Sequence, residues 1–149
     1  MERPLRISLD TNILIGILSG TPEGHIDDAS IRQGQDDGHD FLVCGVVYTE
    51  LMAHPGMDRT TLDAALLSGG VEVDFETPPE VYLTAADANR AYAERRRRSG
   101  DKKEPRRVAA DFLIGAHALC RADGLMTRNP GDFKDIAVTL IVPEAEGKR

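Results

Sequence analysis

The segment LRISLDTNILIGIL, residues 5–18, decides how this chain begins to fold. Its first five residues, Leu5 to Leu9, form a short apolar run that predicts a buried β-strand, and Asp10 ends that run. Thr11 and Asn12 then open an apolar helical stretch that Ser19-Gly20-Thr21-Pro22 stops. The segment therefore begins an alternation of strands and helices, with a carboxylate at the first junction.

The same alternation continues to the other end of the chain. Residues 23–40 are polar and acidic, and they fit either a short exposed helix around 27–35 or a loop. The helix expected over 106–120 carries Val108, Phe112, Gly115 and Leu119 along one side. The pattern predicts an α/β/α sandwich with a mainly parallel sheet, forming a single domain over residues 1–149. Further strands are expected at 41–44, 71–73, 125–127 and 138–142, and further helices at 46–54, 59–67 and 79–98.

Composition favours a layered fold over an aromatic-rich β-sandwich. Of the 149 residues, 41% are apolar but only 5% are aromatic, and Trp is absent, so the core must come from Leu, Ile, Val and Ala. No signal peptide is recognised, and no apolar run approaches the roughly 20 residues of a membrane span. We therefore expect a cytoplasmic protein. Cys44 and Cys120 lie in apolar stretches and are interpreted as buried reduced thiols, with a disulfide or a shared metal as the alternative.

Charge is unevenly distributed along the chain. The net charge is −7, which by itself disfavours a nucleic-acid partner. The segment from Arg90 to Arg107, however, holds nine basic residues against three acidic ones. This basic segment lies just before Asp111 in the sequence. A solvated helix end and a ridge that guides phosphates both explain such a cluster.

Five polar residues are expected at one edge of the sheet. With right-handed crossovers, the carboxyl ends of parallel strands and the amino ends of the following helices share an edge, where open α/β sheets bind ligands. A cluster of carboxylates there needs a cation, and hard oxygen ligands select Mg²⁺ or Mn²⁺, which activate water toward phosphodiesters. Motifs for phosphate-binding loops, zinc proteases, dithiol sites and serine hydrolases are absent. The five candidate catalytic residues are Asp10, Glu50, Asp111, Asn129 and Asp132.

Each of these residues also has a purely structural explanation. Asp10 could cap a helix, and Glu50 and Asp111 could be acids that the helix dipole favours. Asn129 and Asp132 lie in Asn-Pro-Gly-Asp, which is typical of a turn. No histidine is assigned to catalysis, and His54 and His117 are interpreted as packing or surface residues.

Four motifs in sequence order resemble those of PIN-domain proteins, and more narrowly of VapC toxins from toxin–antitoxin pairs. The resemblance covers almost the whole chain, and its strength comes from the order and spacing of the motifs, since each is short. The motifs are Asp10-Thr11-Asn12, Tyr48-Thr49-Glu50-Leu51, Ala110-Asp111-(x)2-Ile114-Gly115-Ala116 and Thr127-Arg128-Asn129-(x)2-Asp132-Phe133.

The resemblance implies a five-stranded parallel sheet and a divalent-metal-dependent endoribonuclease acting on RNA of the tRNA or rRNA class. Asp10, Glu50 and Asp111 would be the metal-binding acids, with Thr11, Asn12 and Thr127 supporting them. Asn129 stands where the family most often has a fourth acid, and Asp132 is close enough to contribute instead. The residues expected to bind RNA are Arg95, Arg96, Arg97, Arg98, Lys102, Lys103, Arg106, Arg107 and Arg128.

The resemblance also implies partners. A homodimer is expected, silenced by a small antitoxin that buries apolar surface of the first helices and pushes a basic side chain into the acids. Two other functions stay open: an RNA-processing nuclease without an antitoxin, and a non-catalytic RNA- or protein-binding module of the same fold. An acid-pocket phosphatase is more distant, because its aspartyl nucleophile pattern is absent with Asn at position 12.

Overall fold

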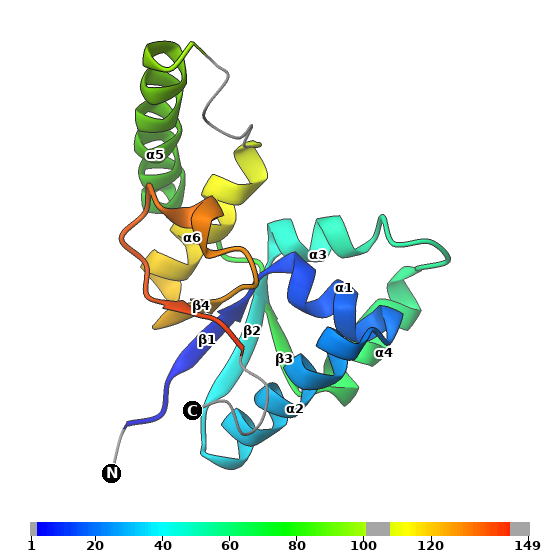
Figure 1. Cartoon of the computed structure of the whole chain (residues 1–149). Coiled ribbons are helices and arrows are strands. Elements are labelled where there is room, and N and C mark those ends of the chain that lie inside the picture. Colours follow the sequence, from blue (N-terminus) through cyan, green and yellow to red (C-terminus); the bar gives the residue numbers. More distant parts are fainter. Residues whose placement is uncertain (1–2, 101–107, 144–149) are drawn as a thin grey trace.

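A five-stranded parallel sheet forms the centre of the computed structural model, which describes residues 3–100 and 108–143 (Figure 1). The strand order is β3-β2-β1-β4-β5, so the first strand of the chain lies in the middle of the sheet. In the register, Ile7 of β1 lies opposite Phe41 on one side and Gly124 on the other. The predicted α/β class and parallel sheet are confirmed. The strands are β1 (Arg6–Leu9), β2 (Asp40–Cys44), β3 (Val71–Asp74), β4 (Gly124–Met126) and β5 (Leu140–Ile141).

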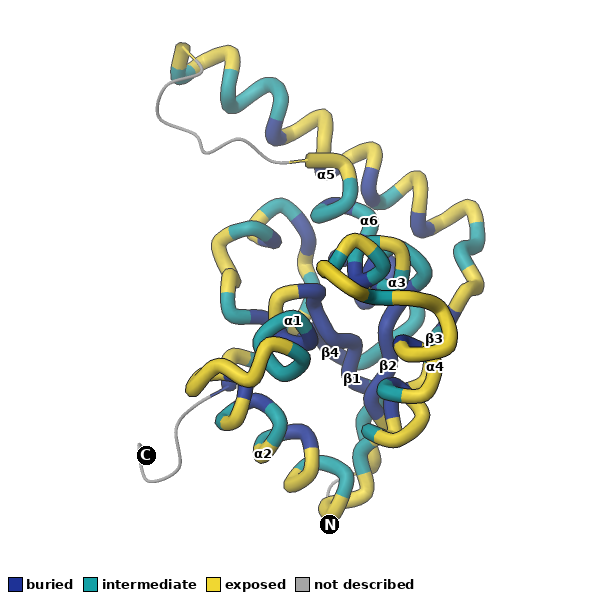
Figure 2. Tube along the Cα trace, turned by 90° about the vertical axis from the view of Figure 1, so that its right-hand side faces the viewer, coloured by how far each residue is buried: buried dark blue, intermediate teal, exposed yellow. Residues whose placement is uncertain are grey.

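Helices cover both faces of this sheet. Helices α1, α2 and α4 lie on one side, and α6 with the long α5 outside it lies on the other (Figures 1 and 2). A buried apolar cluster joins the sheet to the first group, and a second cluster joins α5 to α6. The helices are α1 (Thr11–Ser19), α2 (Pro22–Asp36), α3 (Gly45–Leu51), α4 (Arg59–Ser68), α5 (Pro79–Arg98) and α6 (Ala109–Arg121), with a 3₁₀ turn η1 (Pro130–Phe133).

Helix α2 decides between the two structures predicted for residues 23–40, a short helix or a loop. It spans Pro22–Asp36, longer than the short helix that was one alternative. Thr21 caps it, because its Oγ1 accepts a hydrogen bond from the Gly24 N–H at 3.0 Å, and Pro22 is preorganised for the first helical turn. The N-cap at Thr21 and the proline at the first helical position thus explain why this mostly polar stretch is helical.

Helices α1 and α2 cross at two glycines, which lets their backbones approach closely. A Cβ placed on Gly24 would lie within 2.1 Å of the Gly16 carbonyl oxygen, so that no side chain fits there. Thr21 adds a hydrogen bond from its Oγ1 to the same carbonyl at 3.3 Å. The close crossing fixes α2 beside the helix that begins at Asp10.

Helix α3 is shorter than predicted. It ends at Leu51, whereas the sequence pattern predicted a helix to His54. The N–H groups of Ala53 and His54 bond to the carbonyls of Glu50 and Leu51, three residues back, which makes turns in place of a further helical turn. Glu50 therefore lies near the carboxyl end of α3 and not in its opening turns.

Helix α6 buries more than the one side predicted, and of that side Phe112 and Gly115 are buried. Val108 and Leu119 are 57% and 41% exposed, while Phe112 and every residue from Ile114 to Ala118 is buried. The sheet covers one side of the helix and α5 another, so its buried surface is too wide for a single stripe. Both cysteines are free thiols, as predicted, but only Cys44 is buried, because Cys120 lies at the partly open boundary between α5 and α6.

No helix among the described residues is long and apolar enough to cross a membrane.

Candidate active site

Four carboxylates from four separate segments line one cavity of about 300 Å³. The segments are the β1–α1 junction, the end of α3, the start of α6 and the η1 turn, all at the carboxyl edge of the sheet. Strand geometry explains this convergence, because all strands of a parallel sheet end at the same edge and the segments that follow them start there. The lining residues are Asp10, Thr11, Asn12, Ile15, Glu50, Ala53, Asp111 and Asp132.

Asp10 is held through both of its carboxylate oxygens. It follows β1 and is only 5% exposed. Its Oδ1 accepts a hydrogen bond from the Thr11 N–H, and its Oδ2 accepts one from the Thr127 hydroxyl, each at 2.8 Å. The Thr127 Oγ1 in turn accepts the Asn129 N–H at 2.9 Å. Asp10 does cap α1, as the structural explanation proposed, but it also faces the acid cavity.

Thr11 joins two acids from different elements. Its N–H bonds Asp10, and its hydroxyl donates to Glu50 Oε1 at 2.6 Å. Thr11 is 7% exposed, so these bonds compete little with water. One residue therefore sets the distance between the acid after β1 and the acid at the end of α3.

Asp111 and Asp132 complete the cavity from the other side. Asp111 is the third residue of α6, and Asp132 lies in η1, where its N–H bonds the Asn129 carbonyl at 3.0 Å. Within the described residues, Asp132 lines the cavity and Asn129 does not. Asn129 contributes backbone bonds to the turn. Asp132 is therefore the residue placed to act as the fourth acid.

The electrostatics of the cavity disfavour an ionised Asp10. Burial is the main cause that raises the pKa of this carboxyl above its usual value, and the charges of Asp111 and Glu50 raise it further. The hydrogen bonds from Thr127 and Thr11 oppose the shift without cancelling it. A cation in the cavity would relieve both the burial penalty and the repulsion.

Comparison with known families identifies this arrangement. A family model for the PIN domain matches residues 7–138, from β1 to the approach to β5. The chain belongs to the PIN-domain family. The resemblance inferred from the four motifs is thereby confirmed. No curated protein matches the chain.

Solved structures show the same PIN fold at low sequence identity. VapBC-1 from nontypeable Haemophilus influenzae is 23% identical with a TM-score of 0.63, covering 92% of this chain and 97% of the other. A toxin–antitoxin complex from Klebsiella pneumoniae is 18% identical with a TM-score of 0.62, covering 93% and 98%. VapBC2 from Rickettsia felis, bound to a promoter DNA fragment, is 19% identical with a TM-score of 0.60, covering 93% and 99%.

The carboxylates of this PIN domain have the donor chemistry of a magnesium or manganese site. Their oxygens are hard ligands, and the repulsion that Asp111 and Glu50 exert on Asp10 favours a cation. Across residues 3–100 and 108–143, however, no group of three or more His, Cys, Asp or Glu side chains is placed to enclose an ion. Mg²⁺ keeps several waters and commonly binds through one or two carboxylates. The donors therefore fit a hydrated ion held by part of the cluster.

Two of the arginines predicted to bind RNA are engaged in ion pairs within the PIN domain. Arg95 pairs with Asp135 through both Nη atoms, at 2.6 and 2.9 Å. Arg128 pairs with Asp27 of α2, whose side chain is 2% exposed, at 2.5 Å. The guanidinium of Arg96 lies 5.9 Å from the centre of the Tyr92 ring.

Arg97 and Arg98 are exposed at the end of α5. Lys102, Lys103, Arg106 and Arg107 lie outside the described residues.

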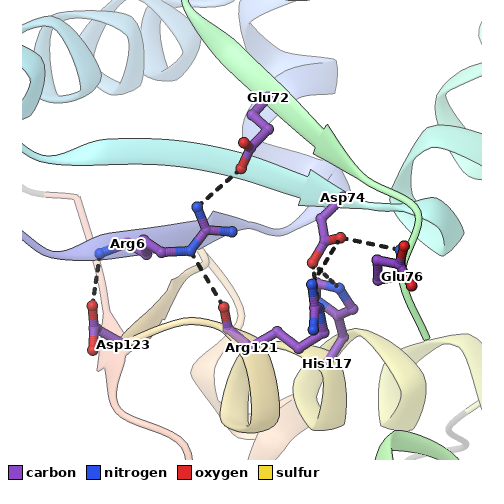
Figure 3. Close-up of polar contacts among 7 residues, drawn as sticks. All are labelled: Arg6, Glu72, Asp74, Glu76, His117, Arg121 and Asp123. Atoms are coloured by element: carbon purple, nitrogen blue, oxygen red, sulfur yellow. Dashed lines mark hydrogen bonds and ion pairs between the residues drawn. The ribbon is translucent and has the colours of Figure 1, made fainter. Parts of the chain in front are cut away.

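A second polar cluster, which the sequence reasoning missed, joins β3 to α6 (Figure 3). Asp74 Oδ2 lies 2.6 Å from Arg121 Nε and 3.1 Å from His117 Nε2. Burial acts to raise the pKa of Asp74, but Arg121 and the other partners lower it overall. Burial lowers the pKa of His117, which is 2% exposed. The one available signal was the spacing of His117 and Arg121, which puts both on one face of a helix.

Proposed function

We propose that this PIN domain is a divalent-metal-dependent endoribonuclease and the toxin of a type II toxin–antitoxin pair. The convergence of four carboxylates on one cavity carries the proposal. PIN domains are generally nucleases, and the similar solved structures include VapBC complexes, which supports the narrower assignment. The substrate would be a cellular RNA of the tRNA or rRNA class, reached in the cytoplasm.

The proposed chemistry assigns a role to each residue of the cavity. Asp10, Glu50 and Asp111 would hold Mg²⁺ or Mn²⁺, which when bound supplies an activated water and neutralises charge on the scissile phosphate. Thr127 and Thr11 hold the two oxygens of Asp10, and Thr11 also holds Glu50. Asn12 lines the mouth of the cavity, where its amide could bond water or phosphate.

Asp132 would replace the acid that the family usually has at the position of Asn129. It lines the cavity from η1, opposite the β1–α1 junction. A fourth carboxylate there adds negative charge beside Asp111 and so strengthens the attraction for a cation. Its contribution depends on how firmly the turn holds it.

An apolar groove between α1, α2 and α4 would receive the antitoxin. Its lining includes Leu14, Ile17, Ile31, Leu62 and Leu66, with Asp28 as a polar residue. A partner that buries apolar side chains in this groove and directs a Lys or Arg toward the acids would both bind and inhibit. A homodimer remains part of the proposal.

RNA cleavage by the purified chain tests the proposal. The chain, freed of any partner, is incubated with total tRNA and rRNA in Mg²⁺, in Mn²⁺ and in EDTA, beside Asp10→Asn. Discrete fragments that require metal and disappear in the variant are expected. Intact RNA in every lane, from a folded protein that binds Mn²⁺, would contradict the nuclease and favour a binding module.

A further inference from the structure

The loop between β4 and β5, which carries Asp132, is anchored on α6 by two apolar side chains. Phe133 and Ile136 are 1% and 7% exposed. A Cβ on Gly115 would lie 2.8 Å from the Ile136 Cδ1 and 3.0 Å from the Phe133 Cδ1, so this glycine provides the space they fill. Gly115 lies one turn after Asp111 on the same helix. The anchor therefore ties Asp132 to the element that carries Asp111.

An ion pair holds the outer end of the same loop. Asp135, three residues after Asp132, bonds both Nη atoms of Arg95 in the last turn of α5. The two side chains are 9% and 29% exposed, respectively, so the pair is largely shielded from solvent. A two-bond guanidinium–carboxylate contact fixes orientation as well as distance.

The loop between β4 and β5 has little regular secondary structure of its own. The η1 turn has four residues, and backbone hydrogen bonds from Asp132 to Asn129 and from Ile136 to Phe133 lie at its two ends. A 3₁₀ turn of this kind is weakly bonded. The contacts of Phe133 and Ile136 with α6 and of Asp135 with α5 therefore help to define where Asp132 lies.

We propose that the Arg95–Asp135 ion pair positions Asp132 in the acid cavity, so that Arg95 is a positioning residue and not an RNA contact. The inference rests on the proposed nuclease function, for which Asp132 serves as the fourth acid. Sequence alone assigned Arg95 to the RNA-binding ridge, because it stands in a run of four arginines. Its bonding partner separates it from exposed Arg97 and Arg98.

Two neutralising substitutions of opposite charge distinguish the two roles. Arg95→Gln removes a positive charge and Asp135→Asn removes a negative one, yet both break the same pair. Positioning predicts the same result for both: kcat falls about tenfold to a hundredfold with KM unchanged. An RNA contact predicts opposite results, with KM raised by Arg95→Gln and lowered or unchanged by Asp135→Asn. The double variant should be no worse than either single one.

The matched control is Arg90→Gln on the same helix. Arg90 pairs with Glu94 within α5 and its side chain is 81% exposed, so its loss should leave kcat and KM unchanged. Circular dichroism and thermal unfolding of every variant identify any that fail to fold. Hydrogen exchange of the Asp132 and Ile136 amides adds a readout independent of cleavage, and both pair-breaking variants should exchange faster there.

These measurements separate failure of the inference from failure of the function. Unchanged kcat and unchanged exchange in both variants of an active enzyme would overturn the inference, as would a rise in KM confined to Arg95→Gln. Wild-type protein that cleaves no RNA would overturn the proposed function. Faster exchange in both variants would then still support the positioning of Asp132.

Discussion

At the scale of single residues, the acid site is held by short bonds between residues that are far apart in sequence. Asp10 and Thr127 are separated by 117 positions and Thr11 and Glu50 by 39, yet each pair is hydrogen-bonded. The raised pKa of Asp10, caused first by burial, means that its ionised form costs folding free energy. We therefore expect the ionised Asp10 to lower the free energy of unfolding while its charge is available to bind a cation.

The substitution Asp10→Asn tests both effects of the Asp10 charge, on stability and on cleavage. Because the folded pKa of Asp10 lies above 3.8, ionisation at neutral pH destabilises the folded state, and a neutral amide removes that cost. We expect a higher Tm in EDTA, together with a loss of RNA cleavage of about a hundredfold or more. The stabilisation that Mn²⁺ gives the wild-type protein should also shrink.

The control for this substitution is Asp87→Asn, at an exposed position of α5. It should change neither the Tm nor cleavage. A lower Tm for Asp10→Asn in EDTA would show that its hydrogen bonds outweigh the cost of the buried charge.

His117 predicts a second, pH-dependent effect on stability. Burial lowers its pKa, so on acidification the unfolded chain takes up a proton that the folded chain resists. The free energy of unfolding should fall as the pH drops below about 6.5, by up to about 1.4 kcal/mol per pH unit. The lowered pKa of Asp74 acts in the same direction at lower pH, below its ordinary value of 3.8.

Urea unfolding at pH 7.5, 6.5 and 5.5 measures this effect. His117→Gln should remove most of the slope between these pH values, whereas His25→Gln, at an exposed position of α2, should leave it. Equal slopes for the wild type and His117→Gln would rule out His117 as its source.

The acids could be placed from sequence, but their partners could not. Asp10 directly follows a predicted strand, and Glu50, Asp111 and Asp132 lie within a few residues of a predicted strand end or helix start, which parallel topology brings to one edge. In the sequence, nothing distinguishes Arg95 and Arg128 from the other arginines, because their partners lie 40 and 101 positions away. Only the tertiary structure shows that these two arginines are already paired.

At the scale of elements, the crossing of α1 and α2 is the least tolerant contact described. A Cβ on Gly24 would collide with the backbone of Gly16, which has no flexible side chain to move. Gly24→Ala should therefore lower the free energy of unfolding by about 1–3 kcal/mol. Gly45→Ala is the matched control, since its Cβ would meet Phe75 Cδ1 at an ordinary 3.5 Å.

The control should be neutral or stabilising by up to about 1 kcal/mol, because Ala is the better helix former. Chemical unfolding of the wild type and both variants in EDTA measures the difference. Equal stability for Gly24→Ala and the wild type would mean that the two helices can separate at little cost.

The predicted elements were correct where local signals were strong. Strands β1 to β4 and helices α4 and α5 lie within a few residues of their predicted bounds. Thr21-Pro22 was interpreted as the stop of α1 and is also the start of α2. The buried surface of α6 was predicted only in part, because periodicity describes one buried stripe, whereas α6 packs against both the sheet and α5.

At the scale of the whole molecule, the groove and the acid cavity are separate surfaces on the same fold. The groove lies between α1, α2 and α4, and the cavity lies at the carboxyl edge of the sheet. Ala65 lines the groove, while its neighbour Ala64 is exposed on the same helix. The two positions allow binding of a partner to be tested apart from catalysis.

Ala65→Arg should weaken binding of the antitoxin without affecting cleavage. The new side chain fills the groove with a charge that a partner's apolar residues cannot solvate. In binding to a cognate antitoxin, we expect the affinity of this variant to be at least about tenfold lower than that of the wild type. Ala64→Arg should bind normally, and both variants should cleave RNA as the wild type does. Equal binding by both would place the partner elsewhere.

The strand order β3-β2-β1-β4-β5 has a consequence for how the protein is made. Strand β1 emerges first from the ribosome, but its neighbour β4 and the residue Thr127 that holds Asp10 are synthesised more than a hundred residues later. Asp111 and Asp132 are also synthesised long after Asp10. A partly translated chain thus contains Asp10 and Glu50 but cannot close the cavity around them. The acid cavity can therefore assemble only after Thr127 and Asp132 have been synthesised, so a nascent chain that ends before them lacks a complete acid cluster.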